Sequence, residues 1–217
     1  MLLYKYRDIS GAGFKNTQDI FINQKLYLPV LGSLNDPKES IAEIQIDNQY
    51  KTYGNLLEER NRKEDTRVFS LSETNRSALM WSHYAASHTG ICIAFDFSDW
   101  QDTESVVLKK VCYVDTPVKM SHSSLSDYDK YAIYKESSWA YEKEWRFISR
   151  HDSFLHIGPN TIKTIFLGAK LDEASLRWVE YWRDVYNPTI EIRKMHFVTC
   201  SYELYDETEL GDKVVRM

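Results

Sequence analysis

The sequence has few of the features of a secreted or disulfide-stabilised protein. Of its 217 residues only three are cysteines. Cys92, Cys112 and Cys200 lie far apart, and none belongs to a Cys-x-x-Cys pair. An odd, scattered set of thiols is typical of neither a disulfide framework nor a zinc site. We therefore expect three buried thiols in a reducing cytoplasm.

Long apolar runs are also missing. No stretch approaches the ~20 apolar residues of a membrane-spanning helix. The opening residues, Met-Leu-Leu-Tyr-Lys-Tyr-Arg, lack the apolar region and the small-residue cleavage site of a signal peptide. These two absences lead us to expect a cytoplasmic protein that does not associate with membranes.

An excess of positive charge is absent as well, since the formal net charge is −5. This balance argues against a duplex binder that is indifferent to sequence, which needs a basic surface. There is no internal repeat and no Gly/Ser or Pro-rich linker. We expect a single globular domain over residues 1–217, long enough to bury a full core. Its one charge-dominated segment lies near 55–67, and we expect that segment to be mobile.

Aromatic residues are plentiful, with 15 Tyr and 6 Trp. Alternating apolar residues predict strands, and apolar residues at i, i+3, i+4 and i+7 predict helices. The expected strands cover 2–7, 25–30, 68–72, 91–97, 106–114, 161–167 and 189–200. The expected helices cover 17–24, 75–88 and 172–186, and one more carries Tyr131, Tyr134 and Ser138. Without steady βαβ alternation, this set predicts an α+β fold with mixed, mainly antiparallel sheet and about four packed helices.

The stretch Trp139–Ser149 carries the densest set of charged and aromatic side chains. Read as a strand from Ala140 onward, it places Glu142, Glu144 and Arg146 on one face. The other face carries Tyr141, Lys143, Trp145 and Phe147, which can pack into a core. Such a charged row can line a cleft. It can equally be a solvated strand face in which Glu144 and Arg146 form a weak surface pair.

The expected helix at 75–88 carries two apolar stripes and two histidines. Thr74 or Asn75 can cap its start, and Gly90 follows its end. His83 and His88 are five residues apart, about 140° around the helix, so they cannot hold one metal as an i, i+4 pair does. We expect His83 to be a buried histidine and expect no metal site.

Several motifs together resemble the bacterial family catalogued as domain of unknown function 2971. The motifs span most of the chain: Leu3-Tyr-Lys-Tyr-Arg7, Asn35-Asp-Pro37, Phe69-Ser70, Met80-Trp-Ser-His-Tyr-Ala85, Gly90-Ile-Cys-Ile-Ala-Phe95, Tyr141-Glu-Lys-Glu-Trp-Arg146 and Ile165-Phe-Leu-Gly168. Leu34 departs from the aromatic residue that the family tends to have there. The resemblance implies no activity.

A second, partial resemblance does imply one. ADP-ribosyltransferases carry an arginine on an early strand, a serine on a middle strand and a Glu-x-Glu entering a late strand. Arg7, Ser70 and Glu142-Lys143-Glu144 occur here in that order. The resemblance implies an ADP-ribosyltransferase-like fold with NAD as the substrate. In such enzymes the second acidic residue stabilises an oxocarbenium-like state and the first faces the acceptor.

The same resemblance assigns the remaining roles. Glu144 and Glu142 are the expected catalytic residues. Arg7 would bind the pyrophosphate, Ser70 the ribose, and Trp81 or Tyr84 would form a wall for the nicotinamide. Tyr6 and His83 complete the expected NAD-binding set, which is Arg7, Tyr6, Ser70, Trp81, Tyr84 and His83.

The leading hypothesis is thus an NAD-dependent ADP-ribosyltransferase, as in a bacterial or phage toxin or defence effector. Its acceptor could be a protein or a nucleic acid, and an antitoxin or regulatory protein is a further expected partner. One alternative is a non-catalytic recognition module that binds a protein partner or a small effector. A third is a metal-dependent nuclease that uses Asp36, Glu142 and Glu144.

Overall fold

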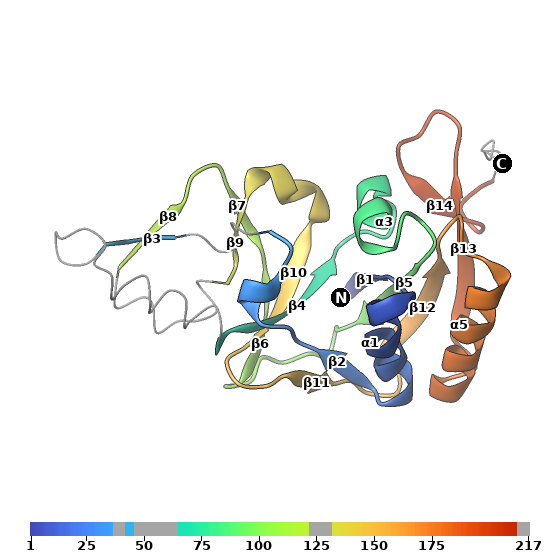
Figure 1. Cartoon of the computed structure of the whole chain (residues 1–217), viewed down its shortest axis with the longest axis horizontal. Helices are drawn as coiled ribbons and strands as arrows, with labels where there is room; N and C mark the ends of the chain where they lie inside the picture. Colours follow the sequence, from blue (N-terminus) through green and yellow to red (C-terminus); the bar gives the residue numbers. More distant parts are fainter. Residues whose placement is uncertain (37–41, 46–64, 122–131, 212–217) are drawn as a thin grey trace. The chain divides into compact units, whose positions relative to one another are not determined.

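The computed structural model describes residues 1–36, 42–45, 65–121 and 132–211 (Figure 1). Contacts divide the chain into two compact units. Unit 1 comprises Met1–Leu26, Leu71–Trp100 and His156–Met217, and unit 2 comprises Tyr27–Ser70 and Gln101–Leu155. Each unit therefore combines segments that are distant in the sequence. The charged segment predicted near 55–67 lies almost wholly outside the described residues.

Unit 1 is built on a mixed, mainly antiparallel sheet (Figure 1). Its strand order is β14-β13-β12-β5-β1-β4. Strand β1 pairs antiparallel with β4 and β5, as does β5 with β12 and β13 with β14, whereas β12 and β13 run parallel. The strands are β1 (Leu2–Arg7), β4 (Arg67–Ser72, whose last two residues belong to unit 1), β5 (Ile91–Asp96), β12 (Ile162–Leu167), β13 (Glu191–Phe197) and β14 (Leu204–Asp206). The α+β prediction is confirmed.

Two helices of unit 1, α1 (Gly11–Ile22) and α5 (Glu173–Tyr186), pack against each other. Phe21 stacks on Trp182, with 6.0 Å between ring centroids, and meets Tyr186 edge-on. The prediction of a helix from Thr17 placed its start too late. Gly13 lets the first turn of α1 approach Asp8, because a Cβ at Gly13 would lie 2.4 Å from the Asp8 carbonyl oxygen.

Helix α5 has the predicted bounds, but the apolar spacing that predicts it, with Trp178, Tyr181, Trp182 and Val185 at i, i+3, i+4 and i+7, does not coincide with its buried face. Asp172 caps it, accepting a hydrogen bond from the Ser175 backbone N–H at 2.7 Å. The buried face consists of Val179, Trp182 and Tyr186. Trp178, Tyr181 and Val185, which belong to that spacing, are 49%, 52% and 49% exposed. The helix thus carries two adjacent apolar stripes, and only one of them is buried.

The third helix, α3 (Ala78–Tyr84), ends earlier than the expected helix at 75–88. A left-handed turn follows it, in which Ala86, Ser87 and His88 have φ of 46°, 54° and 74°. Close backbone packing holds this turn. The Lys170 N–H donates to the His88 carbonyl at 3.0 Å, and a Cβ at Gly168 would lie 2.1 Å from that oxygen.

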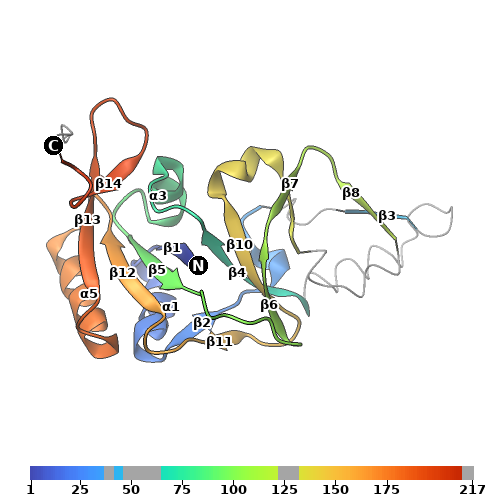
Figure 2. The same ribbon diagram turned by 180° about the vertical axis from the view of Figure 1, so that it is seen from behind.

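Unit 2 contains the strand order β4-β10-β6, visible from both sides in Figures 1 and 2. Its buried core includes Leu31, Val68, Ala132 and Ile148. Strands β7 and β9 pair in parallel, as do β3 and β8. The further elements are η1 (Leu31–Ser33), β3 (Ala42–Gln45), β6 (Val106–Lys110), β7 (Cys112–Val114), β8 (Val118–Ser121), β9 (Tyr134–Glu136), η3 (Ser137–Glu142) and β10 (Glu144–Ser149).

Strands β2 (Lys25–Tyr27) and β11 (Phe154–His156) form a two-stranded sheet where the chain passes from one unit into the other. Within unit 2, the Leu28 N–H donates to the Ser153 carbonyl at 2.9 Å. Tyr27 and Phe154 pack together with ring centroids 5.5 Å apart. Both rings remain partly exposed.

Other predictions need correction. The helix expected to carry Tyr134 and Ser138 is wrong, because Tyr134 lies in β9 and Ser138 in η3; Tyr131 lies outside the described residues. The strand expected over 106–114 is interrupted at Val111. Cys92 is buried as expected, but Cys112 and Cys200 are exposed. Within the described ranges, no helix combines the length and the apolar character needed to cross a membrane.

Candidate functional site

The junction of η3 and β10 brings Glu142 and Glu144 to the same side of the chain. Strand β10 begins at Glu144, later than the strand predicted from Ala140. Lys143 ends η3 in a left-handed conformation, with φ 47° and ψ 52°. Both carboxylates are nevertheless buried, each 3% exposed. Because the residue between them is left-handed and lies outside β10, their shared contact with Lys135 does not come from alternation along a strand.

Lys135 of β9 joins the two carboxylates. Its Nζ lies 2.6 Å from Glu142 Oε2 and 3.1 Å from Glu144 Oε2. The side chain is 4% exposed, and the ammonium lies 4.9 Å from the centroid of the Trp139 ring. An ammonium buried at this depth is stable only with such partners.

Arg146 holds the other side of Glu144. Its Nε donates to Glu144 Oε1 at 2.8 Å, and its Nη2 donates to Oε2 at 2.9 Å. Nη1 donates to the Ala132 carbonyl at 2.6 Å, and the whole side chain is inaccessible. Arg146 is therefore the counter-ion of Glu144. The alternative of a solvated surface pair is wrong, since this is a buried bidentate pair.

The Glu144 carboxyl is held in its ionised form. Burial alone would raise its pKa, but the charge and hydrogen bonds of Arg146, the charge of Lys135 and a hydrogen bond with Ser70 lower it to about 2. A group with this pKa carries a full negative charge at neutral pH. It can stabilise a developing cation but cannot act as a general acid there.

The Tyr113 hydroxyl also fixes the position of Glu144. The Glu144 backbone N–H donates to the Tyr113 hydroxyl at 2.8 Å. Tyr113 lies opposite Lys135 in the parallel β7/β9 pair. Burial, opposed by the hydrogen bond with Glu144, raises the pKa of Tyr113 to about 12. Both sequence neighbours and long-range partners therefore orient this one glutamate.

Three residues predicted for the site come together in unit 2, namely Ser70, Glu142 and Glu144. Sequence reasoning missed Lys135, Tyr113 and Trp139. Lys135 lies in strand β9, whereas the sequence predicts a helix in this segment. The prediction therefore did not place Lys135 beside the two carboxylates. The pairing of β7 with β9, which places Tyr113 and Lys135 opposite each other, has no local signal in the sequence.

The other predicted residues lie in unit 1. The Arg7 guanidinium donates through Nε to Thr17 Oγ1 at 3.0 Å and through Nη2 to the Gly13 carbonyl at 3.4 Å. Burial lowers the pKa of Arg7 to about 10, with Asp8 acting against this shift. Tyr6 donates to the Thr74 carbonyl at 2.8 Å and meets Trp81 edge-on. Burial raises the pKa of Tyr6.

The α3 residues have mixed environments. Trp81 is fully buried and donates through Nε1 to the Asn75 carbonyl at 2.6 Å. Tyr84 is half-buried, with its ring centroid 6.3 Å from that of His83. His83 is exposed, so the expectation of a buried His83 is wrong. His88 is the buried histidine instead, and burial and the nearby Lys170 lower its pKa.

A small pocket adjoins the charged cluster. It has a volume of about 190 Å³, below the roughly 300–1,000 Å³ of sites that take drug-sized ligands. It can hold one ring or one side chain. The lining residues are Val114, Asp115, Thr116, Pro117, Tyr134, Lys135 and Glu136. Among the described residues, no group of three or more His, Cys, Asp or Glu is arranged to hold a metal.

Comparison with known proteins identifies one family. The family model described as "Protein of unknown function (DUF2971)" matches residues 80–147, a span that includes α3 from Met80 onward, the left-handed turn, Lys135 and the Glu142/Glu144 pair. The resemblance drawn from the sequence motifs is thereby confirmed. No curated protein and no solved structure matches the chain.

Proposed function

Starting from a family whose description assigns no activity, we propose that this chain is an NAD-dependent ADP-ribosyltransferase whose reacting centre is Glu144. The observation that carries the proposal is the hydrogen bond between Ser70 and Glu144. These residues were selected from the sequence as the ribose-binding serine and the second acidic residue of one site. They are far apart in the chain, so chance proximity is not expected.

The charge state of Glu144 suits the reaction. The bond between C1′ of the ribose and the nicotinamide nitrogen breaks, and its electron pair stays on nicotinamide, which leaves as a neutral molecule. No general acid is needed. The ribose becomes oxocarbenium-like, and a fixed carboxylate stabilises that charge. A pKa of about 2 keeps Glu144 available for this role at neutral pH.

The acceptor completes the reaction. A nucleophilic atom of a protein or a nucleic acid bonds to C1′ and gives up its proton. Glu142 is the candidate to face it, as the first acidic residue of the Glu-x-Glu. Lys135 bridges both carboxylates in the present structure, so the substrate must displace its ammonium from Glu144 Oε2. The proposed roles of Arg7, Tyr6, Trp81, Tyr84 and His83 rest on the family resemblance alone.

The first experiment measures nicotinamide release from NAD by the purified chain. Glu144→Gln keeps the shape of the side chain and removes its charge, and we expect at least a 100-fold loss of rate. Glu104→Gln, a change at an exposed glutamate of the same unit, should leave the rate unchanged. Equal NAD consumption by wild type and Glu144→Gln would rule out the role of Glu144.

Misfolding of the variant needs its own control. Glu144→Gln leaves Lys135 and Arg146 with one carboxylate between them, which destabilises a buried cluster. The double variant Glu144→Gln/Arg146→Met restores neutrality, because Lys135 and Glu142 remain as a pair. If the double variant regains thermal stability without regaining NAD turnover, the loss of rate is chemical. If stability and turnover return together, Glu144 serves only the fold.

One observation favours a second candidate function, a non-catalytic recognition module. The four charged side chains of the cluster satisfy one another, as the charges of a purely structural network do. This candidate predicts no NAD turnover in wild type. It predicts instead that a protein partner or small effector raises the melting temperature, and that Glu142→Gln and Glu144→Gln reduce the rise only as far as they destabilise the fold.

A further inference from the structure

The outer side of α5 carries an apolar stripe that unit 1 does not bury. Trp178, Tyr181 and Val185 are spaced i, i+3 and i+7 and are each about half exposed. They are among the most exposed large apolar side chains of the described residues. A stripe of this kind on a helix that already packs through another face is typical of an interaction surface.

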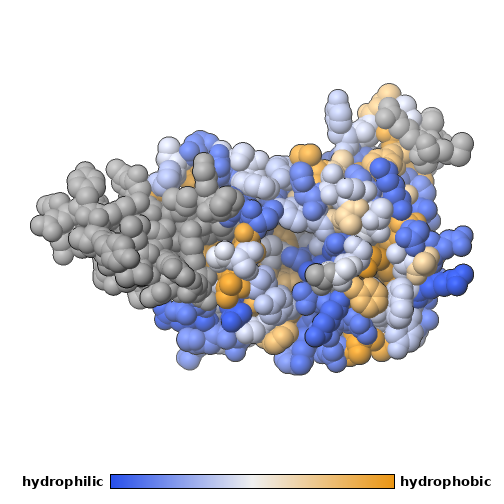
Figure 3. All heavy atoms as spheres, viewed as in Figure 1, coloured by the Kyte–Doolittle hydropathy of each residue, from blue (hydrophilic) through white to orange (hydrophobic). Residues whose placement is uncertain are grey.

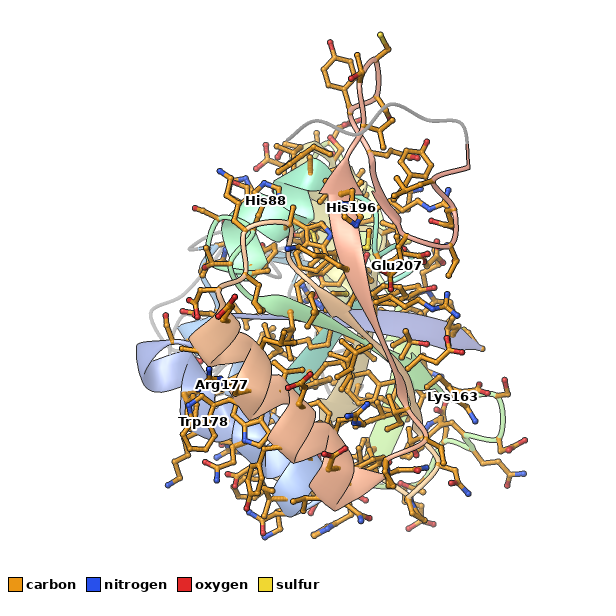
Figure 4. The ribbon with its side chains drawn as sticks, turned by 90° about the vertical axis from the view of Figure 1, so that its right-hand side faces the viewer. His88, Lys163, Arg177, Trp178, His196 and Glu207 are labelled. Atoms are coloured by element: carbon orange, nitrogen blue, oxygen red, sulfur yellow. The ribbon has the colours of Figure 1, made fainter. Side chains whose placement is uncertain are left out.

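The stripe is fixed in place and continues onto α1. Phe14 of α1 meets Trp178 edge-on, with 5.3 Å between ring centroids, and contacts Trp182 at 5.0 Å. Trp178 also contacts Tyr181 edge-on at 6.2 Å. Figure 4 shows α5 toward the viewer, with Trp178 on the side of α1. On the face seen in Figure 3, apolar residues lie among hydrophilic ones in the region of these helices. Aromatic rings braced in this way lose little conformational freedom when a partner covers them.

The charges beside the stripe are self-complementary. Arg177 and Asp184 lie about two helical turns apart on the same flank of the stripe. If two copies of α5 pack antiparallel about a two-fold axis between them, Arg177 of each copy lies opposite Asp184 of the other. The same axis places Trp178 of one copy against Tyr181 of the other. An isologous interface requires such reciprocity.

From this geometry we infer that α5 is a self-association surface, in which a second copy of this chain covers the stripe formed by Trp178, Tyr181 and Val185. The apolar area is modest, roughly 250 Å² per copy if Trp and Tyr bury half of their usual 150–250 Å². Stable dimers bury about 800 Å² per partner. The dimer is therefore weak, with a Kd on the order of 100 μM, and it forms at high local concentration.

Sedimentation equilibrium of the full chain between 10 μM and 1 mM tests this inference. Wild type should pass from monomer to dimer across the range. Trp178→Ser should weaken the dimer at least tenfold. Tyr202→Ser removes an aromatic that is 98% exposed elsewhere in the unit and should have no effect. A wild type that stays monomeric at 1 mM overturns the inference, and so does a dimer that Trp178→Ser leaves intact.

Exchanging the charges of Arg177 and Asp184 tests whether the two copies pack in the antiparallel two-fold arrangement or through some other contact of the same stripe. Arg177→Asp and Asp184→Arg should each weaken the dimer about threefold or more, because each places like charges in apposition. The double variant Arg177→Asp/Asp184→Arg should recover wild-type affinity within about threefold. Asp184 also pairs with Arg183 at 2.6 Å, but an exposed pair of this kind contributes little. Failure of the double variant to recover would overturn the two-fold arrangement.

Discussion

Glu144 is the most constrained ionisable residue in the described part of unit 2. Arg146 binds both of its oxygens, Lys135 binds one, and its backbone N–H donates to Tyr113. Burying a carboxylate costs several kcal/mol, so the partners must offset that cost. A group this tightly held gives the native state a measurable dependence on pH.

Acid should weaken the fold through Glu144. Its folded pKa of about 2 lies below the ordinary value of 4.5, so its contribution is complete above pH 4.5 and is lost as the pH falls toward 2. The difference corresponds to about 3 kcal/mol. Urea unfolding between pH 7 and pH 2.5 should show this loss in wild type.

The comparison variant for this experiment is Glu144→Gln/Arg146→Met. Without the Glu144 carboxyl, the fall in unfolding free energy between pH 4.5 and pH 2.5 should be smaller by most of that amount. Glu104→Gln, which changes an exposed glutamate, should follow the wild-type curve. A double variant with the full wild-type slope would show that other carboxyls carry the acid sensitivity.

For individual residues, the sequence predicted which side chains belong to the cluster better than it predicted whether they are buried. The Glu-x-Glu and Arg146 could be singled out together because residue types and short spacing are local information, and they do belong to one network of ion pairs. Their burial was not predicted, since a run of charged residues normally marks a solvated face. Lys135 supplies the second positive charge, which with Arg146 balances the two carboxylates. Only the chain's path through η3 brings it to both carboxylates.

The turn that follows α3 is the most unusual element of unit 1. Three consecutive non-glycine residues, Ala86, Ser87 and His88, have positive φ. Each such residue costs about 1 kcal/mol or more, because its Cβ approaches the following carbonyl oxygen. The packing of the His88 carbonyl against Lys170 and Gly168 must offset that cost.

A glycine in this turn should therefore stabilise the protein. Ser87→Gly removes the Cβ at an exposed residue with φ 54°, and we expect the free energy of unfolding to rise by about 0.5–1 kcal/mol. The same change in the helix, Ser82→Gly, should lower it by about 0.5–1 kcal/mol. Thermal or urea denaturation of both variants measures whether the free energy of unfolding rises or falls. A decrease for Ser87→Gly would show that the turn adopts another conformation in solution.

The two apolar stripes of α5 should differ sharply in their effect on stability. Trp182→Ala removes a fully buried ring that packs on Phe14 and Phe21, and it should cost about 3–5 kcal/mol. Trp178→Ala, four residues earlier, should cost about 1 kcal/mol or less at dilute concentration. Urea denaturation at a few micromolar measures both. Equal losses would mean that Trp178 is also part of the core.

The existence and the type of most helices and strands could be predicted from the sequence. The residues at which they end, and the faces that they bury, could not. Strong alternation in Ile91–Asp96 and Ile162–Leu167 identified two central strands. Helix α5 was found through its cap at Asp172 and its apolar spacing. Its buried face could not be read from the spacing, because eight of its residues are apolar or aromatic and they cover a wide arc. Only the position of α1 decides which arc is buried.

At the scale of the whole molecule, each unit has a core of its own. Unit 1 buries Phe21, Trp81 and Trp182, and unit 2 buries Leu31, Val68 and Ile148. Cores of this kind can open separately, because local opening follows the density of buried contacts. A destabilising change should therefore affect its own unit first.

Hydrogen exchange read by mass spectrometry checks this separation. Trp182→Ala should speed exchange in peptides from 1–26, 71–100 and 156–211, while peptides from 101–121 and 132–155 keep their wild-type rates. Ile148→Ala, in the core of unit 2, should show the reverse pattern. If either variant speeds exchange equally throughout, the chain opens as one cooperative body.

The order in which the segments occur along the chain has a consequence for biosynthesis. All segments of unit 2 precede His156, whereas unit 1 needs β12, α5 and β13, which are translated later. The segments around Glu144 can therefore fold while β5 still lacks its pairing with β12 and α1 still lacks its packing against α5. During that interval the apolar faces of β5 and α1 are uncovered. Slow translation of the segment from His156 onward would lengthen this exposure, and chaperone dependence should follow the rate at which that segment emerges.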